Sequence, residues 1–208
     1  MMIKKYTRYL PLVYGGALAL LAAPMLMESL VLLPGNAALT MLMSNKPVRP
    51  ESLDILARSS EMALSVRESG KSWSQLALAL AHKAGSCEPG SSEQTDELER
   101  ARKAQINGLR LQPANPHSWL RLAYINLRLG DMEKAAAALY MSYVTGPYEI
   151  YLAEYRLTIS ATMWNYLDER TTMAVFDEVR LLHAQNPGWL DQRMKSSDAV
   201  RNIARQAL

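Results

Sequence analysis

The sequence is poor in the residues that build cross-links and metal centres. Cys87 is its only cysteine, so the chain can form neither an internal disulfide nor a cysteine-based metal site. Its three histidines, His82, His117 and His183, lack the His-Glu-x-x-His or Cys/His spacing of metal-binding motifs. The sequence therefore predicts no metal ion and no cofactor.

Motifs of catalysis are also missing. The chain has no G-x-S-x-G nucleophile elbow, no phosphate-binding glycine loop and no dinucleotide fingerprint. Carboxylates such as Asp177 and Glu178 fall on amphipathic segments, where we expect them to form solvated helix faces. An enzyme would need polar residues that converge in a pocket, and the sequence indicates none. We therefore expect that the protein is not an enzyme.

Clustered positive charge is confined to the first residues. The formal net charge is +3, and Lys4, Lys5 and Arg8 precede the first acidic residue, so the remainder is close to neutral. No later stretch gathers Lys and Arg on one face with interleaved aromatic residues, as a nucleic-acid interface requires. The sequence therefore predicts no nucleic-acid partner.

The apolar residues favour helices. Phe176 is the only phenylalanine, and Ala, Leu and Met, which are good helix formers, supply most of the apolar surface. With 208 residues, the chain can build one ordinary domain and a short accessory segment. We expect an all-α fold.

One apolar run, from Leu10 to Leu33, is long enough to span a bilayer, which takes about 20 residues. Because basic residues precede the run, the positive-inside rule places the amino terminus in the cytoplasm and the rest of the chain across the membrane. We expect residues 1–33 to form a cytoplasmic amino terminus and a transmembrane signal anchor, with residues 10–33 in the membrane. This predicts a single-pass inner membrane protein with a periplasmic helical domain.

The alternative for this segment is a cleaved signal peptide. An A-x-A-like cleavage triplet is missing just after the run, and the run is longer than in most signal peptides, so we favour the uncleaved anchor. Tyr6, Tyr9 and Tyr14 lie where interfacial aromatic residues belong. Glu28, the only ionisable residue of the run, is expected near the far interface, where its carboxylate can reach water.

Prolines and glycines predict a juxtamembrane linker over residues 34–50, because Pro34-Gly35 would end the first helix and Pro47 and Pro50 interrupt the stretch after Met43. The linker contains an apolar patch that could rest on the membrane or, as we favour, pack under the domain: Leu39, Met41, Leu42 and Met43.

Residues 51–208 are expected to form the exported helical domain. Apolar residues recur at helical spacing, and turn residues separate the segments. Ser91, Asn115 and Asp168 are the expected N-caps of three of its helices. The final segment, Leu190 to Leu208, is expected to be one helix whose sparse apolar face is formed by Val200, Ile203 and Leu208.

Within this domain, residues 116–147 carry a recognisable pattern. Its positions are Trp119, Leu122, Ala123, Gly130, Asp131, Ala135, Leu139, Ser142 and Pro147. In physical terms, Trp119 and Leu122 fill the space between two helices, Ala123 and Ala135 are small where the helices cross, and Gly130 permits a tight turn. This segment resembles a tetratricopeptide repeat.

Two further segments resemble the repeat less completely. Residues 71–113 match it at Trp73, Leu76, Ala77, Leu80, Ala101, Gly108 and Pro113, although a loop of about ten residues around Cys87 replaces the short turn. Residues 148–187 form a degenerate pair in which Leu152, Tyr155 and Ile159 keep the spacing only after a one-residue shift. The resemblance implies a short α-solenoid of antiparallel helix pairs.

The resemblance also implies a binding module, in which the concave surface of the first helices holds a partner protein. The residues expected on that surface are Lys71, Ser74, Leu78, His82, His117, Leu120, Tyr124, Leu127 and Arg128. The alternative for each of them is packing against a neighbouring pair or ordinary solvated surface. A tyrosine cluster is a second candidate surface, although its helical spacing slightly favours a core position: Tyr140, Tyr143, Tyr148, Tyr151, Tyr155 and Tyr166.

These expectations favour a membrane-anchored tetratricopeptide-like scaffold for protein-protein interaction in a bacterial cell envelope, with another envelope or membrane protein as its partner. By analogy, such layouts occur in envelope assembly, secretion and surface-polysaccharide systems. One alternative is a structural subunit of a larger membrane complex, and another is a small periplasmic hydrolase. The sequence leaves the oligomeric state open.

Overall fold

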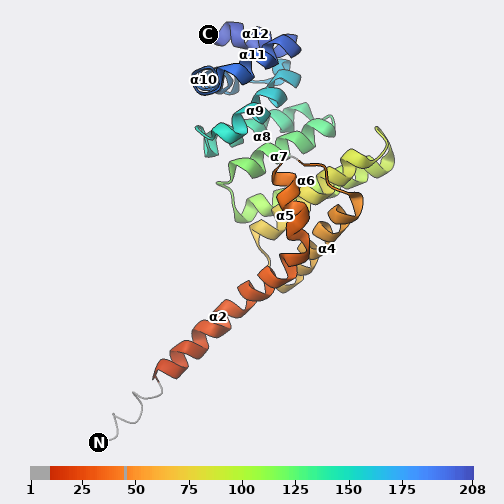
Figure 1. Ribbon diagram of the computed structural model, residues 1–208, viewed down its shortest axis with the longest axis vertical. Helices are drawn as coiled ribbons and strands as arrows, with labels where there is room; N and C mark the ends of the chain where they lie inside the picture. The colour runs from red at the N-terminus through yellow and green to blue at the C-terminus, as the bar shows by residue number, and fades with distance from the viewer. Residues whose placement is uncertain (1–9, 45) are drawn as a thin grey trace, which may run out of the picture.

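The structure, a computed structural model, describes residues 10–44 and 46–208, and it places side chains from Tyr14 onward. The described residues form helices and connecting turns, with no strand, which confirms the all-α expectation (Figure 1). The basic and aromatic residues predicted to flank the membrane on the cytoplasmic side lie outside the described residues: Lys4, Lys5, Tyr6, Arg8 and Tyr9.

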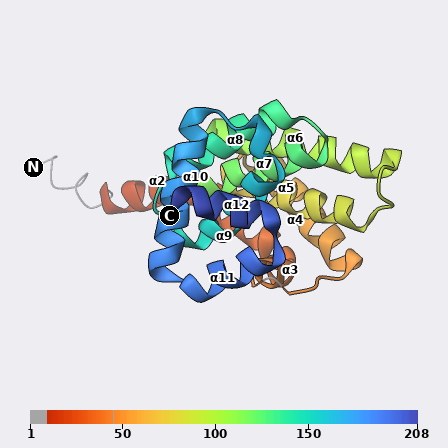
Figure 2. The same cartoon turned by 90° about the horizontal axis from the view of Figure 1, so that it is seen from above.

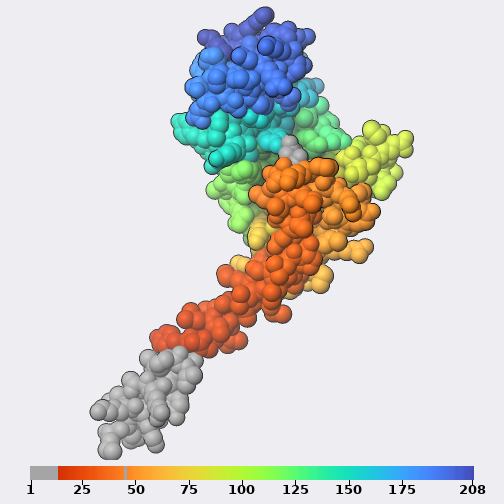
Figure 3. Space-filling model, in the orientation of Figure 1, coloured from red at the N-terminus to blue at the C-terminus, as the bar shows by residue number. Residues whose placement is uncertain are grey.

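The first described element is a long apolar helix. Helix α2 (Leu10–Leu32) is followed directly by the 3-10 turn η1 (Leu33–Gly35) and by α3 (Asn36–Met43). Among the described residues, Tyr14–Met43 is the one helical stretch long and apolar enough to cross a membrane, with a mean hydropathy of 2.0 in its best window. Most of its side chains are exposed, and α2 projects away from the rest of the molecule (Figure 3).

The predicted linker is helical as far as Met43, so the expectation of an irregular segment from residue 34 is wrong there. Pro34 lies within the short turn η1, at an early position where its missing N–H breaks no helical hydrogen bond. Gly35 lets the chain approach α4 (Pro50–Val66) closely, because a Cβ at Gly35 would lie 2.5 Å from Ser59 Oγ. Packing against α4 therefore stabilises the continuation of the helix.

The apolar patch of the predicted linker is divided between the core and the surface. Leu39 and Leu42 are half-buried against the core of the first helices. Met41 and Met43 are exposed. The alternative that we favoured, packing under the domain, thus holds for the two leucines but not for the two methionines.

Beyond α4 the chain forms a stack of helices that leads away from α2 (Figure 1). They are α5 (Gly70–Ser86), α6 (Ser92–Leu111), α7 (Pro116–Arg128), α8 (Met132–Thr145), α9 (Ile150–Thr162), the 3-10 turn η2 (Trp164–Tyr166), α10 (Glu169–Gln185), α11 (Pro187–Ser196) and α12 (Asp198–Ala207). Helix α5 packs against α6, α7 against α8, and α9 against α10. The domain is therefore built of packed helix pairs.

Polar side chains fix where these helices begin. The side chains of Ser91, Asn115 and Asp168 each accept a hydrogen bond from a backbone N–H in the first turn of their helix, as predicted. Asn186 and Ser197 do the same for α11 and α12. The cap at Ser197 divides the predicted final helix into two.

Two other sequence-based expectations need correction. Leu208 is exposed, and Ala204 and Ala207 complete the buried face of α12 with Val200 and Ile203. The connection around Cys87 spans only residues 87–91, shorter than the expected loop of about ten residues, because α5 continues to Ser86 and α6 begins at Ser92. Their tip projects from the side of the stack in two perpendicular views (Figures 1 and 2).

Small residues allow the helices of each pair to approach closely. Ala123 on α7 and Ala135 on α8 are fully buried. In the first pair, a Cβ at Gly108 would lie 3.3 Å from the carbonyl oxygen of Gly70, so a larger residue there would push α5 and α6 apart. Gly130, with a φ of 79°, makes the turn between α7 and α8.

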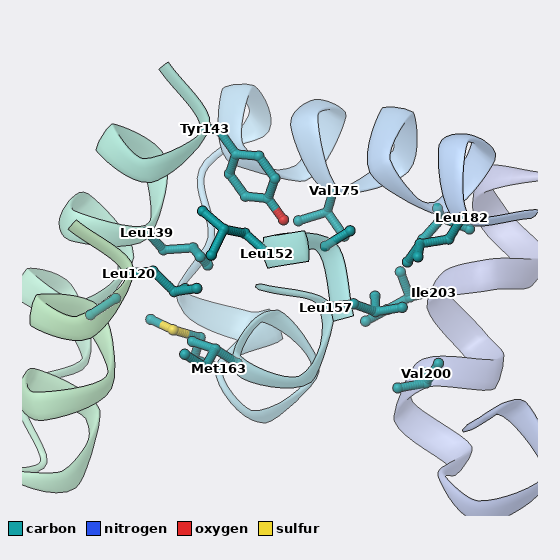
Figure 4. Close-up of a cluster of buried hydrophobic side chains, with 14 of the residues drawn as sticks. Leu120, Leu139, Tyr143, Leu152, Leu157, Met163, Val175, Leu182, Val200 and Ile203 are labelled. Atoms are coloured by element: carbon teal, nitrogen blue, oxygen red, sulfur yellow. The ribbon is translucent and has the colours of Figure 1, made fainter. Parts of the chain in front are cut away.

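Two apolar cores run through the stack. The first lies among α3, α4, α5 and α6 and includes Leu56, Leu80 and Leu98. The second joins α7 to α12, and Figure 4 shows side chains of α8, α9, α10 and α12 that follow one another across it: Leu139, Leu152, Leu157, Leu182 and Ile203.

Candidate partner-binding groove

The candidate groove is formed by the exposed faces of α5 and α7, the first helices of two successive pairs. These helices lie side by side, with the hydroxyl oxygens of Ser74 and Ser118 only 3.2 Å apart. Of the predicted groove residues, the exposed ones are Lys71, His82, His117, Tyr124 and Arg128, and the half-buried ones are Ser74, Leu78 and Leu127. The five exposed positions remain accessible to a partner.

Leu120 departs from the expectation. Its side chain is only 7% exposed and belongs to the core that joins α7 to α12. Leu127 is half-buried against the same core. For these two leucines the structure favours the alternative weighed from the sequence, packing against neighbouring helices.

Arg121 connects the two inner helices and was not predicted. Its Nη1 donates to the carbonyl oxygen of Ser74 at 3.0 Å, to Ser74 Oγ at 2.7 Å and to Gln105 Oε1 at 3.1 Å. Within residues 10–44 and 46–208, no carboxylate forms an ion pair with it. Burial lowers the pKa of Arg121 to about 10, so the guanidinium stays charged at neutral pH.

The pKa values of the two groove histidines are lowered mainly by desolvation. Desolvation by the surrounding protein lowers the pKa of His82, and the charge of Arg121 lowers it further. Desolvation also lowers the pKa of His117; Glu149 raises it in part, while Arg121 and Arg156 lower it. Both imidazoles are therefore neutral at pH 7, where they can donate one hydrogen bond and accept another.

The tyrosine cluster is split between surface and core. Tyr143 is buried and Tyr140 is half-buried, whereas Tyr148, Tyr151, Tyr155 and Tyr166 are exposed. Tyr151 and Tyr155 lie one turn apart on α9, the first helix of the third pair, and Tyr151 is 81% exposed. On α7, the Tyr124 hydroxyl accepts a hydrogen bond from Arg128 Nη1 at 2.8 Å. The inner helices thus present aromatic side chains with polar tips.

A buried ionic cluster holds the third pair together. Arg156 on α9 is fully buried and donates to Glu178 Oε1 on α10 at 3.2 Å and to the carbonyl oxygen of Ser142 on α8 at 2.5 Å. The Tyr143 hydroxyl donates to Glu178 Oε2 at 2.8 Å. Glu178 was expected on a solvated face and is instead 4% exposed, while its neighbour Asp177 is exposed. Burial raises the pKa of Glu178 to about 7, although Tyr143 and Arg156 lower it in part.

A second ionic cluster joins α2 to the domain. Glu28 is 6% exposed and accepts hydrogen bonds from Arg67 Nη1 at 2.9 Å, from Ser72 Oγ at 2.8 Å and from the Ser69 hydroxyl. The expectation that its carboxylate faces water is therefore wrong. These partners come about forty residues after Glu28, as the 39 residues to Arg67 illustrate, so spacing along the chain could not reveal them.

In the described part of the chain, no three His, Cys, Asp or Glu side chains are grouped so that they could hold a metal ion. A scan against protein-family models and a search of curated proteins each give no match to this chain. The resemblance to a helical repeat therefore depends on the residues of this chain and on its packed helix pairs.

Proposed function

We propose that the protein is a membrane-anchored scaffold of tetratricopeptide-like helix pairs, whose inner surface on α5, α7 and α9 binds another protein of a bacterial cell envelope. Its work is positioning a partner rather than catalysis. Helix α2 serves as the anchor of a single-pass inner membrane protein with a cytoplasmic amino terminus and a periplasmic domain.

The observation that carries the proposal is the unbalanced charge of Arg121 between the two inner helices. Arg121 is half-buried, and a partly desolvated cation without a carboxylate partner is costly, so an anionic group of a bound partner would offset that cost. Exposed tyrosines on α7 and α9, namely Tyr124, Tyr151 and Tyr155, belong to the type of side chain that is enriched in protein interfaces. We therefore expect the bound segment to carry a carboxylate.

The proposal is tested by site-specific photo-cross-linking in the full-length protein. A photoreactive residue replaces Tyr124 on α7, and a matched variant carries it at Lys103, an exposed residue on the outer helix α6. We expect one defined envelope protein to be cross-linked from position 124 and not from position 103, in protein purified from membranes in mild detergent. Equal cross-linking from both positions, or none from 124, contradicts a partner in the groove.

Mass spectrometry of the same preparation tests the anchor. We expect the amino-terminal peptide to begin at Met1 or Met2 and the chain to remain in the membrane fraction. A processed chain that is recovered without detergent contradicts the anchor but leaves the groove to be judged by the cross-linking result.

A structural subunit of a larger membrane complex is the second candidate. The exposed apolar side chains of Met41 and Met43 on α3, and of Ile55 and Met62 on α4, favour it, because such surface is usually covered. A complex of fixed stoichiometry that survives detergent and does not depend on Tyr124 or Arg128 would favour this candidate over the scaffold.

A further inference from the structure

A pocket of about 420 Å³ lies where α2 meets the domain. Met25, Glu28 and Ser29 of α2 form one wall. The turn between α4 and α5 and the first residues of α5 form another, and Leu111 at the end of α6 completes the rim. The pocket therefore lies between an apolar helix and a polar edge of the domain.

If Leu10 lies at one surface of a bilayer, the position of the pocket along α2 is close to the opposite surface. An α-helix rises by about 1.5 Å per residue, so Glu28 lies about 27 Å along the axis from Leu10. The hydrocarbon core of a bilayer is about 30 Å thick. In the anchored arrangement proposed above, on which this inference rests, the pocket opens at the level of the phospholipid headgroups on the side of the domain.

The charges that line the pocket balance one another. Arg67 and Lys71 are the cations, and Glu28 and Glu68 are the anions. Glu28 is already bound by Arg67, whose side chain remains 40% exposed, and Glu68 accepts a hydrogen bond from Trp73 Nε1 at 3.2 Å. Lys71 is exposed, and its ammonium forms no ion pair with any residue that the structure describes.

Ser29, Ser69 and Gln112 add further polar groups to the lining, and two apolar side chains, Met25 and Leu111, lie beside them. Met25 and Leu111 are large exposed hydrophobic side chains at the rim, and Leu21 and Leu18 continue the exposed apolar surface down α2. An acyl chain can lie along this surface while its headgroup occupies the polar end of the pocket. A free phosphate ion would make no use of the apolar rim.

We propose that this pocket binds a phospholipid whose headgroup carries both a phosphate and an amine. Lys71, with the exposed part of Arg67, holds the phosphate, and the carboxylate of Glu68 receives the ammonium. The balanced charge of the lining disfavours a headgroup with net negative charge, because Glu68 would repel it. One lipid bound in this way would fix the domain against the membrane at the base of α5.

The test uses the full-length protein reconstituted in vesicles that contain equal amounts of phosphatidylethanolamine and phosphatidylglycerol. After release into mild detergent, native mass spectrometry measures the lipid that stays bound. We expect one retained phosphatidylethanolamine and about tenfold less of it in Lys71→Glu, since reversing one charge at a membrane surface changes the binding free energy by about 1–2 kcal/mol. Lys103→Glu, which makes the same charge change on α6, keeps the wild-type level.

Glu68→Gln tests the amine. We expect this variant to retain phosphatidylethanolamine and phosphatidylglycerol equally, because the group that distinguishes them is gone. The proposal is overturned by a wild-type protein that retains no lipid or retains both lipids equally, and by equal lipid loss in Lys71→Glu and Lys103→Glu. It is also overturned if inorganic phosphate displaces the bound lipid, since the site would then belong to a free anion.

These outcomes separate the lipid site from the proposed function. If the protein does not insert into vesicles, both the anchored scaffold and the lipid site are contradicted. If the protein inserts and cross-links its partner from position 124 but retains no lipid, only the lipid site is contradicted.

Discussion

Glu28 and Glu178 are two glutamates that have similar surroundings in different regions of the molecule. Both are nearly inaccessible, both accept a hydrogen bond from an arginine, and both have a hydroxyl donor as well. Their arginine partners differ in exposure: the side chain of Arg67 is 40% exposed, whereas that of Arg156 is 0% exposed. Glu28 lies at an edge of the domain, and Glu178 lies inside it.

This difference separates two uses of an ion pair. At the edge, Arg67 can turn to water when Glu28 is removed, so we expect the pair to position α2 without controlling whether the domain folds. Inside the domain, the loss of one partner leaves a charge that cannot reach water. The packing of α8, α9 and α10 therefore depends on Arg156 and Glu178 being present together.

The largest effect is expected from Arg156→Met. At pH 8, above the pKa of Glu178, this change leaves the ionised Glu178 buried beside Tyr143 without its cation and should lower the free energy of unfolding by about 3–5 kcal/mol. Denaturant unfolding of the full-length chain in detergent measures it. Adding Glu178→Leu to the same chain should recover much of the loss, since an apolar pair of similar volume leaves no buried charge. A loss below about 1 kcal/mol in Arg156→Met would contradict the comparison.

The pH dependence of stability should come next in size. The pKa of Glu178 is raised from 4.5 to about 7 in the folded protein, so the folded state holds a proton that the unfolded state has released in this range. Its contribution to stability is therefore complete below pH 4.5 and is lost as the pH rises towards 7, by at most about 3 kcal/mol. Denaturant unfolding of the wild type and of Glu178→Gln across this pH range measures the effect. The free energy of unfolding of the wild type, relative to that of Glu178→Gln, should fall with rising pH. A constant difference would show that Glu178 does not titrate there.

A smaller and local effect is expected from Glu28→Gln. The amide keeps the size of the side chain and weakens its bonds to Arg67 and Ser72, which should cost about 1–2 kcal/mol. Hydrogen exchange should accelerate in the last turns of α2 and the first turn of α5, while α9 and α10 keep the wild-type protection. Faster exchange throughout the domain would mean that the two clusters are not independent.

The smallest effect is expected from Asp177→Ala. Asp177 pairs with Arg180 on the exposed face of α10, next to Glu178 in sequence. Exposed pairs contribute about 0–1 kcal/mol, so the midpoint of unfolding should hardly change. This variant is the matched control for the substitutions at Glu178, and a loss as large as theirs would show that the charge of α10 matters more than burial.

Much of the fold was predictable because its signals are local. The caps at Ser91, Asn115 and Asp168 involve N–H groups only three residues away, so a short stretch of sequence specifies them. The same holds for the turn at Gly130 and for the apolar length of α2. The continuation into α3 was missed because proline and glycine usually end a helix, and here contact with α4 outweighs that tendency.

The candidate groove was only partly predictable. The spacing of repeat residues indicated which faces of α5 and α7 are accessible. It could not distinguish Leu120, which is buried in the core, from Tyr124, which is exposed. Arg121 and Arg156 were missed because charged residues are expected at the surface, and their partners lie on other helices. Burial of a charge results from the assembled helices and leaves no pattern in the neighbouring sequence.

The uninterrupted run from α2 through η1 to α3 has a mechanical consequence. Because Gly35 is packed against α4, α2 and the domain should move as one rigid body in the proposed anchored arrangement. The stretch Tyr14–Met43 is 30 residues. At about 1.5 Å per residue, a tilt of about 20° would carry its far end sideways by about 15 Å. In that proposed arrangement, a change in bilayer thickness that alters the tilt of α2 would move the proposed groove relative to its partner.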